Sequence, residues 1–462
     1  MGCFAAALPS SNSSDGALEV FESSLSDLAE VYYPGSEEFT NATIRWGAGQ
    51  TPHYDMIVKV ATEEDVQAAI LYANANDKPF HAISGAHATT TYLNNITNAV
   101  GIYLRGMNAI VIADDGDTAL IQGGILNGDV TDFLWAHDKQ TMTTACACVG
   151  YISPILGGGH GWNQGRYGLA SDQLVSARMV LANGTAITVD ESNPDLFWAI
   201  RGAGHNFGVV TEAEIKIYDK KPDVDQWAVS GYFYTHDKIE DVVSVANSWM
   251  VMANRSVSLE HYVVFSFDPE VDPVNYTDPL VVLSPISTDS GVTDLAGVSK
   301  YTGADRNGPS CTKGFTRSLV PVSADTYDNP SLRKVLDIMA TFPPEFRSSA
   351  VLLESYSTNR VGEIPSDSTA YPDRDGQLLF SPFMTYEKDA SLDAAAWGFA
   401  GEIRDTLIEG TNKIYEAYIN YARGDETTEE LYGYEAWRLE KLRRLKKEYD
   451  PFSKFNFFAP IL

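Results

Sequence analysis

The order of apolar and polar residues changes along the chain, and its first part alternates between predicted strands and helices. The runs MIVKVA (56–61) and PFHAIS (79–84) predict short buried strands. Between them, residues 62–77 place apolar side chains at helical spacing, with Thr62 as the N-cap and acidic residues in the first turn. Two further strands are predicted at residues 101–106 and 118–124. This part of the chain therefore predicts an α/β layout with short strands in a mixed sheet.

Glycine is frequent between the short predicted strands of residues 150–218. Asn183-Gly184 stands between two of these strands and predicts a tight hairpin turn. The other glycines indicate backbone that approaches another group closely, and a large cofactor is the simplest such group.

After Tyr218 the pattern predicts a second domain, an antiparallel sheet with helices on one face. The predicted strands are 226–234, 258–267, 280–286, 349–356 and 377–386, and the predicted helices are 236–253, 330–341 and 391–409. The end of the chain predicts a strand at 415–422 and one helix over 428–449. Residues 9–16, rich in Ser and Asn, predict a loose tail before the fold begins.

Composition removes several classes of protein. The 462 residues correspond to two or three domains at about 150 residues each. Sixty-two acidic residues against 33 Lys and Arg leave a net charge of −29, which argues against binding to nucleic acid or to anionic lipid. No apolar run approaches the roughly 18 residues of a membrane-spanning helix. Four cysteines are too few for a disulfide scaffold.

The glycine-rich stretches do not match the common nucleotide fingerprints. A dinucleotide site of the Rossmann type needs G-x-G-x-x-G between a strand and a helix. GGGHG (157–161) lacks the third glycine, and GAGHNFG (202–208) places it one residue late. A Walker sequence is also missing, so a nicotinamide-dependent dehydrogenase is disfavoured.

The segment ISGAHATTT (83–91) is the first candidate site. Gly85 and Ala86 leave the backbone nearly bare, so that it can present N–H and hydroxyl donors to phosphate oxygens. His87 beside them is a base and a nucleophile near neutral pH. The simpler alternative is a histidine in a turn, bonded to a carbonyl.

Cys146 and Cys148 form the second candidate site. On an extended chain they share a face, and three functions compete: a zinc half-site, a disulfide, or a thiol directed at a cofactor. Zinc usually takes C-x₂₋₄-C with a second ligand pair, which the sequence does not offer. A disulfide across one residue is strained. Two inert buried thiols are the plain alternative.

Five motifs in order resemble one family. They are ISGAH (83–87), CACVG (146–150), the run from Gly157 to Leu174, the run from Asn193 to Tyr218, and YINY (418–421) with the aromatic end of the chain. Together they resemble the berberine-bridge-enzyme-like branch of the vanillyl-alcohol-oxidase flavoproteins, whose FAD domain is of the p-cresol methylhydroxylase type, and fungal members most of all. The resemblance covers about residues 15–462.

The resemblance implies an α+β fold of two domains. The FAD-binding domain would span residues 20–218, and the substrate domain, an antiparallel sheet covered by helices, would span 219–410. The C-terminal segment 411–462 would return to the FAD domain.

It also implies FAD held by two covalent bonds, from His87 to the 8α-methyl group and from Cys146 to carbon 6 of the isoalloxazine; Cys148 would not be the link. Ala86 stands where the family usually has glycine. The other positions implied to bind the cofactor are Ser84, Gly85, Ala86, Gly150, Gly157, Gly158, Gly159, His160, Asn206, Gly208, Val210 and Asn420.

Three positions carry the implied catalysis. Val149 matches the family position at which valine permits dioxygen to reach the flavin. Tyr421 matches a tyrosine that accepts a proton from the substrate, which needs a pKa below its usual value near 10. Glu363 matches the base of alkaloid-oxidising members, although Val361 and Asp373 depart from that motif, and an exposed loop acid is the alternative.

The sequence therefore predicts an FAD-linked oxidase that oxidises a specialised metabolite by two electrons and reduces dioxygen to hydrogen peroxide. Oxidative cyclisation also lies within the family's range. The alternatives are a carbohydrate or alcohol oxidase and, from another class, a cyclase (pericyclase) on a flavoprotein scaffold without net redox. The expected partners are a small-molecule substrate and dioxygen, without nucleic acid or membrane, in a monomer or weak dimer.

The compartment stays open at this point. The chain carries glycosylation sequons at Asn12, Asn41, Asn95, Asn183, Asn254 and Asn275, which fit a secreted protein whose signal has been removed. If Met1 is the native start, a cytoplasmic protein is expected.

Overall fold

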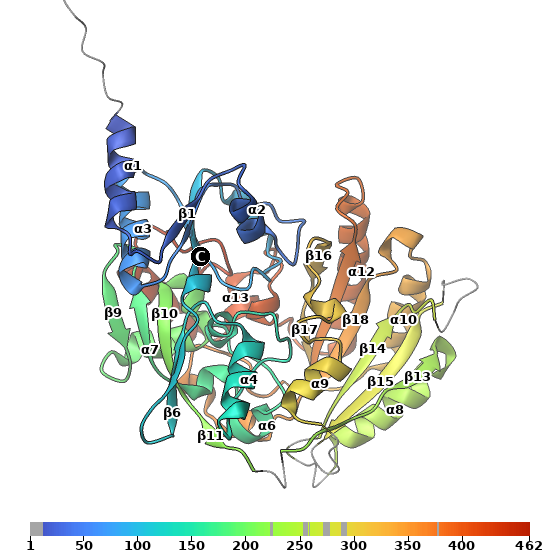
Figure 1. Cartoon of the computed structure of the whole chain (residues 1–462). Coiled ribbons are helices and arrows are strands. Elements are labelled where there is room, and N and C mark those ends of the chain that lie inside the picture. The colour runs from blue at the N-terminus through green and yellow to red at the C-terminus, as the bar shows by residue number, and fades with distance from the viewer. Residues whose placement is uncertain are drawn as a thin grey trace, which may run out of the picture.

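The computed structural model of the chain shows helices and sheets gathered into two halves (Figure 1). It describes residues 13–221, 225–252, 257, 259–270, 278–287, 293–376 and 378–462. Three sheets carry the fold: one of four strands and one of five strands within residues 30–216, and one of eight strands within residues 228–386.

The four-stranded sheet confirms the predicted start of the fold. Its order is β1 (Glu30–Tyr32), β2 (Tyr54–Lys59), β4 (Ala99–Tyr103) and β3 (Phe80–Ile83), with β2, β4 and β3 parallel. Helix α3 (Glu63–Ala75) begins at Thr62, whose side chain accepts a hydrogen bond from the Asp65 N–H in a capping box. Its apolar face packs against the strands in one core cluster. The short helices α1 (Ser13–Ser24) and α2 (Glu37–Thr43) flank this sheet (Figure 1).

The five-stranded sheet is antiparallel and carries the predicted hairpin. Its order is β5 (Ile110–Ile112), β6 (Thr118–Gln122), β10 (Val209–Lys216), β8 (Leu174–Val180) and β9 (Ala186–Val189). The β8–β9 turn uses Gly184 with a φ of +81°, a conformation that favours glycine. Helices α4 (Asn127–Ala136) and α7 (Pro194–Ala203) and the strand pair β7 (Lys139–Gln140) and β11 (Tyr218–Asp219) complete this half.

The eight-stranded sheet confirms the predicted antiparallel sheet with helices on one face. Its strands are β12 (Ala228–Val229), β13 (Tyr232–Thr235), β14 (Glu260–Ser266), β15 (Leu280–Ser287), β16 (Thr316–Leu319), β17 (Val322–Ala324), β18 (Ala350–Ser355) and β19 (Leu378–Tyr386). Helices α8 (Ile239–Met250), α10 (Asn329–Ala340) and α12 (Asp393–Thr411) cover one face (Figure 1). Alternate residues such as Val263 and Leu353 point into that helix-covered core. The residues between them, Tyr262 and Glu354 among them, belong to the opposite face.

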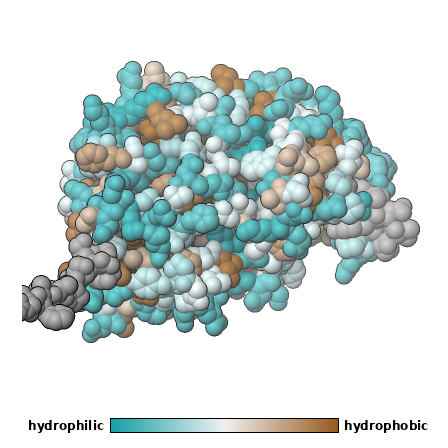
Figure 2. Space-filling view, turned by 90° about the horizontal axis from the view of Figure 1, so that it is seen from above, coloured by the Kyte–Doolittle hydropathy of each residue, from teal (hydrophilic) through white to brown (hydrophobic). Residues whose placement is uncertain are grey.

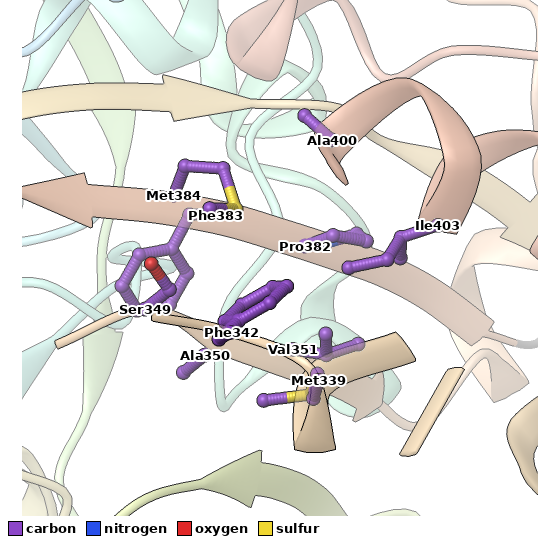
Figure 3. A pocket seen from close by; sticks show the side chains of 10 residues that line it. All are labelled: Met339, Phe342, Ser349, Ala350, Val351, Pro382, Phe383, Met384, Ala400 and Ile403. Atoms are coloured by element: carbon purple, nitrogen blue, oxygen red, sulfur yellow. The ribbon is translucent and has the colours of Figure 1, made fainter. Parts of the chain in front are cut away.

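The helix-covered core contains a small apolar pocket (Figure 3). Side chains from α10, α12, β18 and β19 surround it, including Met339, Phe342, Met384 and Ile403. Its polar side chain, Ser349, accepts a hydrogen bond from the Thr385 N–H at 2.9 Å. The pocket is therefore a packing space in the core and offers no group for chemistry.

The last part of the chain departs from two predictions. The strand predicted at 415–422 is irregular chain that ends in the short helix η9 (Ile419–Tyr421). Its backbone makes single hydrogen bonds, such as that from the Ser323 N–H of β17 to the Glu416 carbonyl at 3.1 Å, and these do not continue into a ladder. The single helix predicted at 428–449 is two helices, α13 (Thr428–Tyr432) and α14 (Ala436–Tyr449), which separate at Gly433.

The predicted loose tail is wrong from Ser13 onward, because those residues begin α1, and residues 9–12 lie outside the described residues. Apolar residues of the C-terminal segment, such as Ile419 and Leu442, share one core cluster with the five-stranded sheet. The predicted domain boundaries stay a prediction.

The surface agrees with the acidic composition. Apolar residues form small separate spots among hydrophilic ones on the face shown in Figure 2. Among the helices of the described residues, none combines the length and the hydropathy that a membrane span requires.

Candidate active site

Two loops distant in sequence meet where the sequence analysis placed its two candidate sites. Residues 84–87 follow β3, and residues 146–150 precede the short helix α5 (Ile152–Ile155). A Cβ atom on Gly85 would lie 2.5 Å from the backbone nitrogen of Gly150, and one on Gly150 would lie 2.6 Å from the Ser84 hydroxyl oxygen. Only glycine permits so close a contact. The structure thus brings the His87 loop and the Cys146 loop side by side.

His87 has the properties of a neutral nucleophile. Its ring stacks on Trp46, with centroids 5.3 Å apart and an angle of 15° between the planes. Its Nε2 atom is buried and has no hydrogen-bond partner among the described residues. Burial, followed by the positive charges of Lys313 and Arg317, lowers the pKa of His87 to about 3. The alternative was a histidine in a turn whose ring bonds a carbonyl. That alternative does not explain why Nε2 is buried without a partner.

Ala86 occupies a strained backbone position between Gly85 and His87. Its φ is +57°, in the left-handed region that favours glycine. Its carbonyl accepts a hydrogen bond from the Trp46 N–H at 3.0 Å, which holds the turn. Ala86 therefore occupies a place where glycine is the relaxed choice.

Cys146 is the free thiol of the second loop. Burial raises the pKa of the thiol, and the backbone N–H groups of Cys148 and Val149 and the charge of Arg317 act in the opposite direction. Those N–H groups point at the sulfur and stabilise its thiolate form. Cys146 is thus a half-buried free thiol whose sulfur is held by its own loop.

Cys148 forms a disulfide with Cys311, a pairing that the sequence analysis did not consider. The two residues are 163 positions apart, and their Cα atoms are separated by 5.8 Å. Because the sulfur of Cys148 is bonded, Cys146 and Cys148 do not offer a pair of thiolates for a zinc half-site.

Val149 lies beside Cys146, half-buried, and its carbonyl accepts a hydrogen bond from the Asn127 N–H at 2.9 Å. Gly150 forms an isolated bridge with Leu126. These contacts fix the loop on the first turn of α4.

The glycine run 157–159 is tied to the C-terminal segment. The backbone N–H groups of Gly159 and His160 both donate to the Tyr418 hydroxyl at 3.2 Å. Asn420 donates to the Pro154 carbonyl at 3.0 Å and to the Gly157 carbonyl at 3.2 Å. Asn420 therefore braces this loop. Gly158 adopts a φ of +101° within the same turn.

His160 uses both ring nitrogens within the protein. Nδ1 lies 2.9 Å from the Gln164 Oε1 atom, and Nε2 lies 2.8 Å from the Tyr371 hydroxyl. Burial lowers the pKa of His160. Because both ring nitrogens have protein partners, neither is left for the predicted contact with the cofactor. His160 supports the loop through Gln164 and Tyr371.

Asn206, also predicted to bind the cofactor, fastens the end of the chain instead. Its amide donates to the Tyr432 hydroxyl at 2.9 Å and to the Ala459 carbonyl at 3.1 Å, and its oxygen accepts from the Ile461 N–H at 3.0 Å. The polar atoms of the Asn206 side chain are thus used within the protein, and the cofactor contact stays a prediction.

Gly208 and Val210 likewise serve packing. A Cβ atom on Gly208 would lie 2.4 Å from the Met179 side chain, and Val210 is buried in β10. Close contact between strands therefore explains both residues.

Tyr421 ends η9 and packs edge-to-face on Tyr418, with centroids 4.9 Å apart. Burial raises the pKa of Tyr421 well above its usual value, and the charges of Glu354 and Cys146 act in the same direction. These interactions place Tyr421 between the Cys146 loop and β18. They also make its phenol a poor base, contrary to the lowered pKa that the predicted role requires.

Glu354 is the functional candidate that the sequence analysis missed. It lies on β18, opposite Tyr262 of β14, on the sheet face opposite α8, α10 and α12. Burial raises its pKa to about 7. The carboxylate accepts hydrogen bonds from the Tyr356 hydroxyl and from the Ser381 hydroxyl, both at 2.7 Å.

The signal for Glu354 was present in the sequence. It is the single charged residue in the strand predicted at 349–356, and the four residues before it, Ala350 to Leu353, are apolar. A lone carboxylate in such a strand needs buried partners. One of them, Tyr356, is two residues away, whereas the other, Ser381, lies on β19 and cannot be found by spacing.

Glu363 lies apart from this arrangement. It ends α11 (Asn359–Glu363), its side chain is 63% exposed, and it pairs with Arg360 at 2.7 Å. This is the exposed acid that the sequence analysis gave as the alternative. Arg374 of the same motif forms a buried pair with Asp172 at 2.8 Å, which is a structural role.

The loops also leave buried polar atoms that a large polar ligand can satisfy. Buried polar groups in proteins almost always have partners. Several on these two loops or within three residues of them have none among the described residues: Ser84 Oγ, His87 Nε2, Thr89 Oγ1, Thr90 Oγ1 and Thr144 Oγ1. Their clustering around one nucleophilic imidazole and one free thiol fits a flavin dinucleotide.

Comparison with known proteins agrees with this site. The chain matches the family described as FAD binding domain over residues 54–190 and the family described as berberine and berberine-like over residues 417–461. FAD-linked oxidoreductase chyH of Penicillium rubens is 36% identical over 474 residues, which cover 97% of this chain and 94% of that protein. FAD-linked oxidoreductase anuG of Penicillium roqueforti is 35% identical over 462 residues, which cover 95% of this chain and 90% of that protein.

Solved structures confirm the predicted α+β architecture of two domains. Xylooligosaccharide oxidase from Myceliophthora thermophila C1 matches with a TM-score of 0.79 at 20% identity, over 97% of this chain and 98% of that chain. Carbohydrate oxidase from Microdochium nivale matches with a TM-score of 0.81 at 16% identity, over 96% and 99%. At such identities the likeness shows the fold alone. The identity and coverage of the Penicillium relatives show the family: this chain is an enzyme that belongs to the berberine-bridge-enzyme-like FAD-linked oxidoreductases.

Proposed function

We propose that this enzyme is an oxidase whose FAD is joined to both His87 and Cys146 and whose substrate is a specialised metabolite. The observation that carries the proposal is the meeting of two loops, one with a buried and unpartnered imidazole nitrogen and one with a free thiol. When bound, FAD supplies the two-electron acceptor, and dioxygen reoxidises it.

On the substrate side, Glu354 is the group best suited to take a proton. A base works best when its pKa lies near the working pH, and burial brings the pKa of Glu354 to about 7. The Tyr356 and Ser381 hydroxyls hold its two oxygens, so the carboxylate keeps one orientation. Tyr421, with its raised pKa, stays neutral and acts as a hydrogen-bond donor that orients the substrate.

The surroundings of Glu354 favour a substrate with a planar or ring-shaped apolar surface. Trp162, Tyr262 and Tyr356 form one aromatic cluster on this side of the sheet, with Trp162 and Tyr262 centroids 5.1 Å apart. Aromatic faces bind rings by stacking. Val149, small and next to Cys146, supports the proposed access of dioxygen.

A carbohydrate or alcohol oxidase is the second candidate. Two of the solved structures with the same fold are oxidases of xylooligosaccharide and of carbohydrate. Aromatic side chains also stack on sugar rings, so the residues around Glu354 suit both classes.

Intact mass after acid precipitation tests the two covalent bonds. We expect a yellow precipitate heavier than the bare chain by one FAD. His87→Ala and Cys146→Ala should each retain that mass, because one bond remains, and the double variant should release all flavin. A colourless wild-type precipitate would refute the proposed linkage.

A peroxide-coupled screen tests the substrate class. One panel contains aromatic and alkaloid-like metabolites and the other contains oligosaccharides. Turnover with the first panel supports the proposal, and turnover confined to the second supports the carbohydrate alternative. A product at the oxidation level of its substrate, without peroxide, would point to a cyclase.

We also propose that the protein folds in an oxidising, glycosylating compartment. The Cys148–Cys311 disulfide supports this, as do the exposed positions of the sequon residues Asn41, Asn95 and Asn183. The sequons at Asn12, Asn254 and Asn275 lie outside the described residues. Protein from its natural source should lose mass on treatment with an endoglycosidase; an unchanged mass would contradict the proposal.

A further inference from the structure

Three sulfur atoms gather beside the proposed flavin site. The Cys146 sulfur lies 3.4 Å from the sulfur of Cys148 and 3.8 Å from that of Cys311. Cys146 is the free one of the three. The proposed bond between Cys146 and the flavin does not itself require a disulfide in contact with the Cys146 sulfur.

The disulfide belongs to a longer contact between the two halves of the molecule. Residues 299–312, here called the bracket, run from α9 (Leu295–Tyr301) past the Cys146 loop. The Ser299 hydroxyl donates to the Ala145 carbonyl at 3.2 Å, and the Ala147 N–H donates to the Ala304 carbonyl at 2.9 Å. Cys311 adds the covalent link. The loop that carries Cys146 is thus held from outside by the bracket.

The same bracket also reaches the support of His87. The indole N–H of Trp46, whose ring stacks on His87, donates to the Ser310 carbonyl at 2.8 Å. Arg317 lies over the Trp46 ring and donates to the carbonyls of Trp46 at 2.8 Å and Thr312 at 2.6 Å. Residues 310–312 therefore contact the supports of both residues proposed to bond the flavin.

The pairing of the three cysteines decides which sulfur is available. A Cys146–Cys148 bond would be strained across a single residue, and a Cys146–Cys311 bond would consume the linking thiol. Only the Cys148–Cys311 pairing leaves Cys146 free. It also fixes the Cys148 and Val149 N–H groups that point at the Cys146 sulfur.

We propose that the bracket, closed by the Cys148–Cys311 disulfide, positions Cys146 for its bond to the flavin and withholds Cys148 from that reaction. Cys148 and Cys311 are therefore positioning residues, and the disulfide precedes the sulfur–flavin bond. This inference rests on the proposed linkage through His87 and Cys146.

The disulfide is not consumed in the bond-forming step. The Cys146 thiol loses its proton to water, and its sulfur forms a bond to carbon 6 of the isoalloxazine. The hydrogen of that carbon leaves as a proton, and the two electrons stay on the ring. Dioxygen, the proposed oxidant of this enzyme, removes the two electrons and becomes hydrogen peroxide. The net change is one thiol, one FAD and one dioxygen to one thioether and one hydrogen peroxide.

The test measures which fraction of the bound FAD stays on the protein after acid precipitation. It is done in the His87→Ala protein, where the Cys146 sulfur is the only proposed covalent link to the flavin. Replacing Cys148 and Cys311 together by serine should lower the rate of covalent incorporation about tenfold or more, since misplacing reacting groups by about 1 Å can cost on the order of 100-fold. Arg306→Ala is the matched control. It removes the bracket's exposed ion pairs to Asp129 and Asp132 and keeps the disulfide, so incorporation should not change.

Single replacement of Cys311 gives a second outcome. With Cys311→Ser, Cys148 becomes a free thiol beside the site, and peptide mapping should find flavin on both Cys146 and Cys148. Flavin on Cys146 alone, at the wild-type rate, in both this variant and the double-serine variant would overturn the proposal.

Two controls are needed. One shows whether the double-serine protein is folded, and the other shows whether the Cys146–flavin bond forms at all. With His87 intact, the double-serine protein should still carry one FAD through the imidazole, which reports a folded site. If that protein does not fold, the His87→Ala protein produced under oxidising and reducing conditions replaces it, and the fraction with acid-stable FAD should follow the fraction with the disulfide. Complete release of FAD from the His87→Ala protein with its disulfide intact would refute the sulfur bond itself.

Discussion

The two sides of the proposed active site are built in opposite ways. On the flavin side, residues 84–87 and 146–150 are irregular loops, and Ser84 and His87 keep buried polar atoms without protein partners. On the substrate side, Glu354 stands on a regular strand, and both of its carboxylate oxygens accept hydrogen bonds from hydroxyl groups. The polar atoms of the flavin side need a polar ligand as partner, whereas the carboxylate of the substrate side already has its partners within the protein.

The difference separates binding from proton transfer. Unsatisfied polar atoms cost free energy until a ligand meets them, so they favour a tightly held cofactor. A buried carboxylate in a fixed network keeps one orientation and a shifted pKa, which suits a substrate that comes and goes. Variants on one side should therefore change flavin content and variants on the other should change turnover.

The largest expected effect is on turnover in Glu354→Gln. The amide keeps the shape of the side chain and cannot accept a proton, so turnover of the substrate found by the peroxide screen should fall by about 10²- to 10⁴-fold. The content of covalent FAD should stay at one per chain. Glu363→Gln, at an exposed position, is the control and should turn over like the wild type; the reverse result would return the base to Glu363.

The pH dependence of stability tests the buried state of Glu354. Its pKa is raised from 4.5 in the unfolded chain to about 7 in the folded protein. Between pH 4.5 and 7 this carboxyl is ionised in the unfolded chain and still protonated in the folded protein. The free energy of unfolding is therefore highest below pH 4.5 and is lower by about 3 kcal/mol above pH 7. In Glu354→Gln this loss should be absent. Urea unfolding of both proteins between pH 4.5 and 8 measures it, and parallel curves would show that Glu354 is not buried as a neutral acid.

Asn206→Ala tests whether a residue near the glycine-rich turn is structural. Its loss leaves the buried Ile461 N–H without an acceptor, which should lower the free energy of unfolding by about 2 kcal/mol. FAD per folded chain should not change. The exposed Asn76→Ala is the control for a generic loss of an amide. A fall in FAD content at unchanged stability would restore Asn206 to the cofactor site.

The smallest expected effect is a gain from Ala86→Gly. Relief of the left-handed backbone gains about 1–2 kcal/mol, and the added freedom of glycine in the unfolded chain returns about 0.4–1, which leaves a net gain of about 0.5 kcal/mol. Ala88→Gly, where φ is not positive, should lose stability instead. Denaturant midpoints of the two variants give the comparison, and a loss in both would show that Ala86 is not strained.

The same contrast explains how much of the molecule the sequence predicts. The residues proposed for the flavin side lie within short motifs, so the resemblance to one family is enough to single out His87 and Cys146. The hairpin at Gly184 and the helix that begins after Thr62 are set by local turn and capping chemistry, and both are confirmed.

The substrate side depends on contacts between strands. Glu354 acquires its properties from Ser381, 27 residues away, and from the face of the sheet opposite α8, α10 and α12. The Cys148–Cys311 pair is separated by 163 residues, so no spacing rule identifies it. The strand predicted at 415–422 failed for a related reason: its alternating pattern is real, but tertiary contacts with residues 154–160 decide its conformation.

The chain end that Asn206 holds has a consequence for synthesis on the ribosome. The core of the five-stranded sheet includes Ile419, Leu442 and Ile461, so it lacks part of its apolar filling until these residues have been translated. The eight-stranded sheet, whose residues emerge earlier, can collapse first while the N-terminal half waits. A nascent or prematurely terminated polypeptide would expose that unfilled surface, and such products are expected to depend on chaperones and to be cleared by proteolysis.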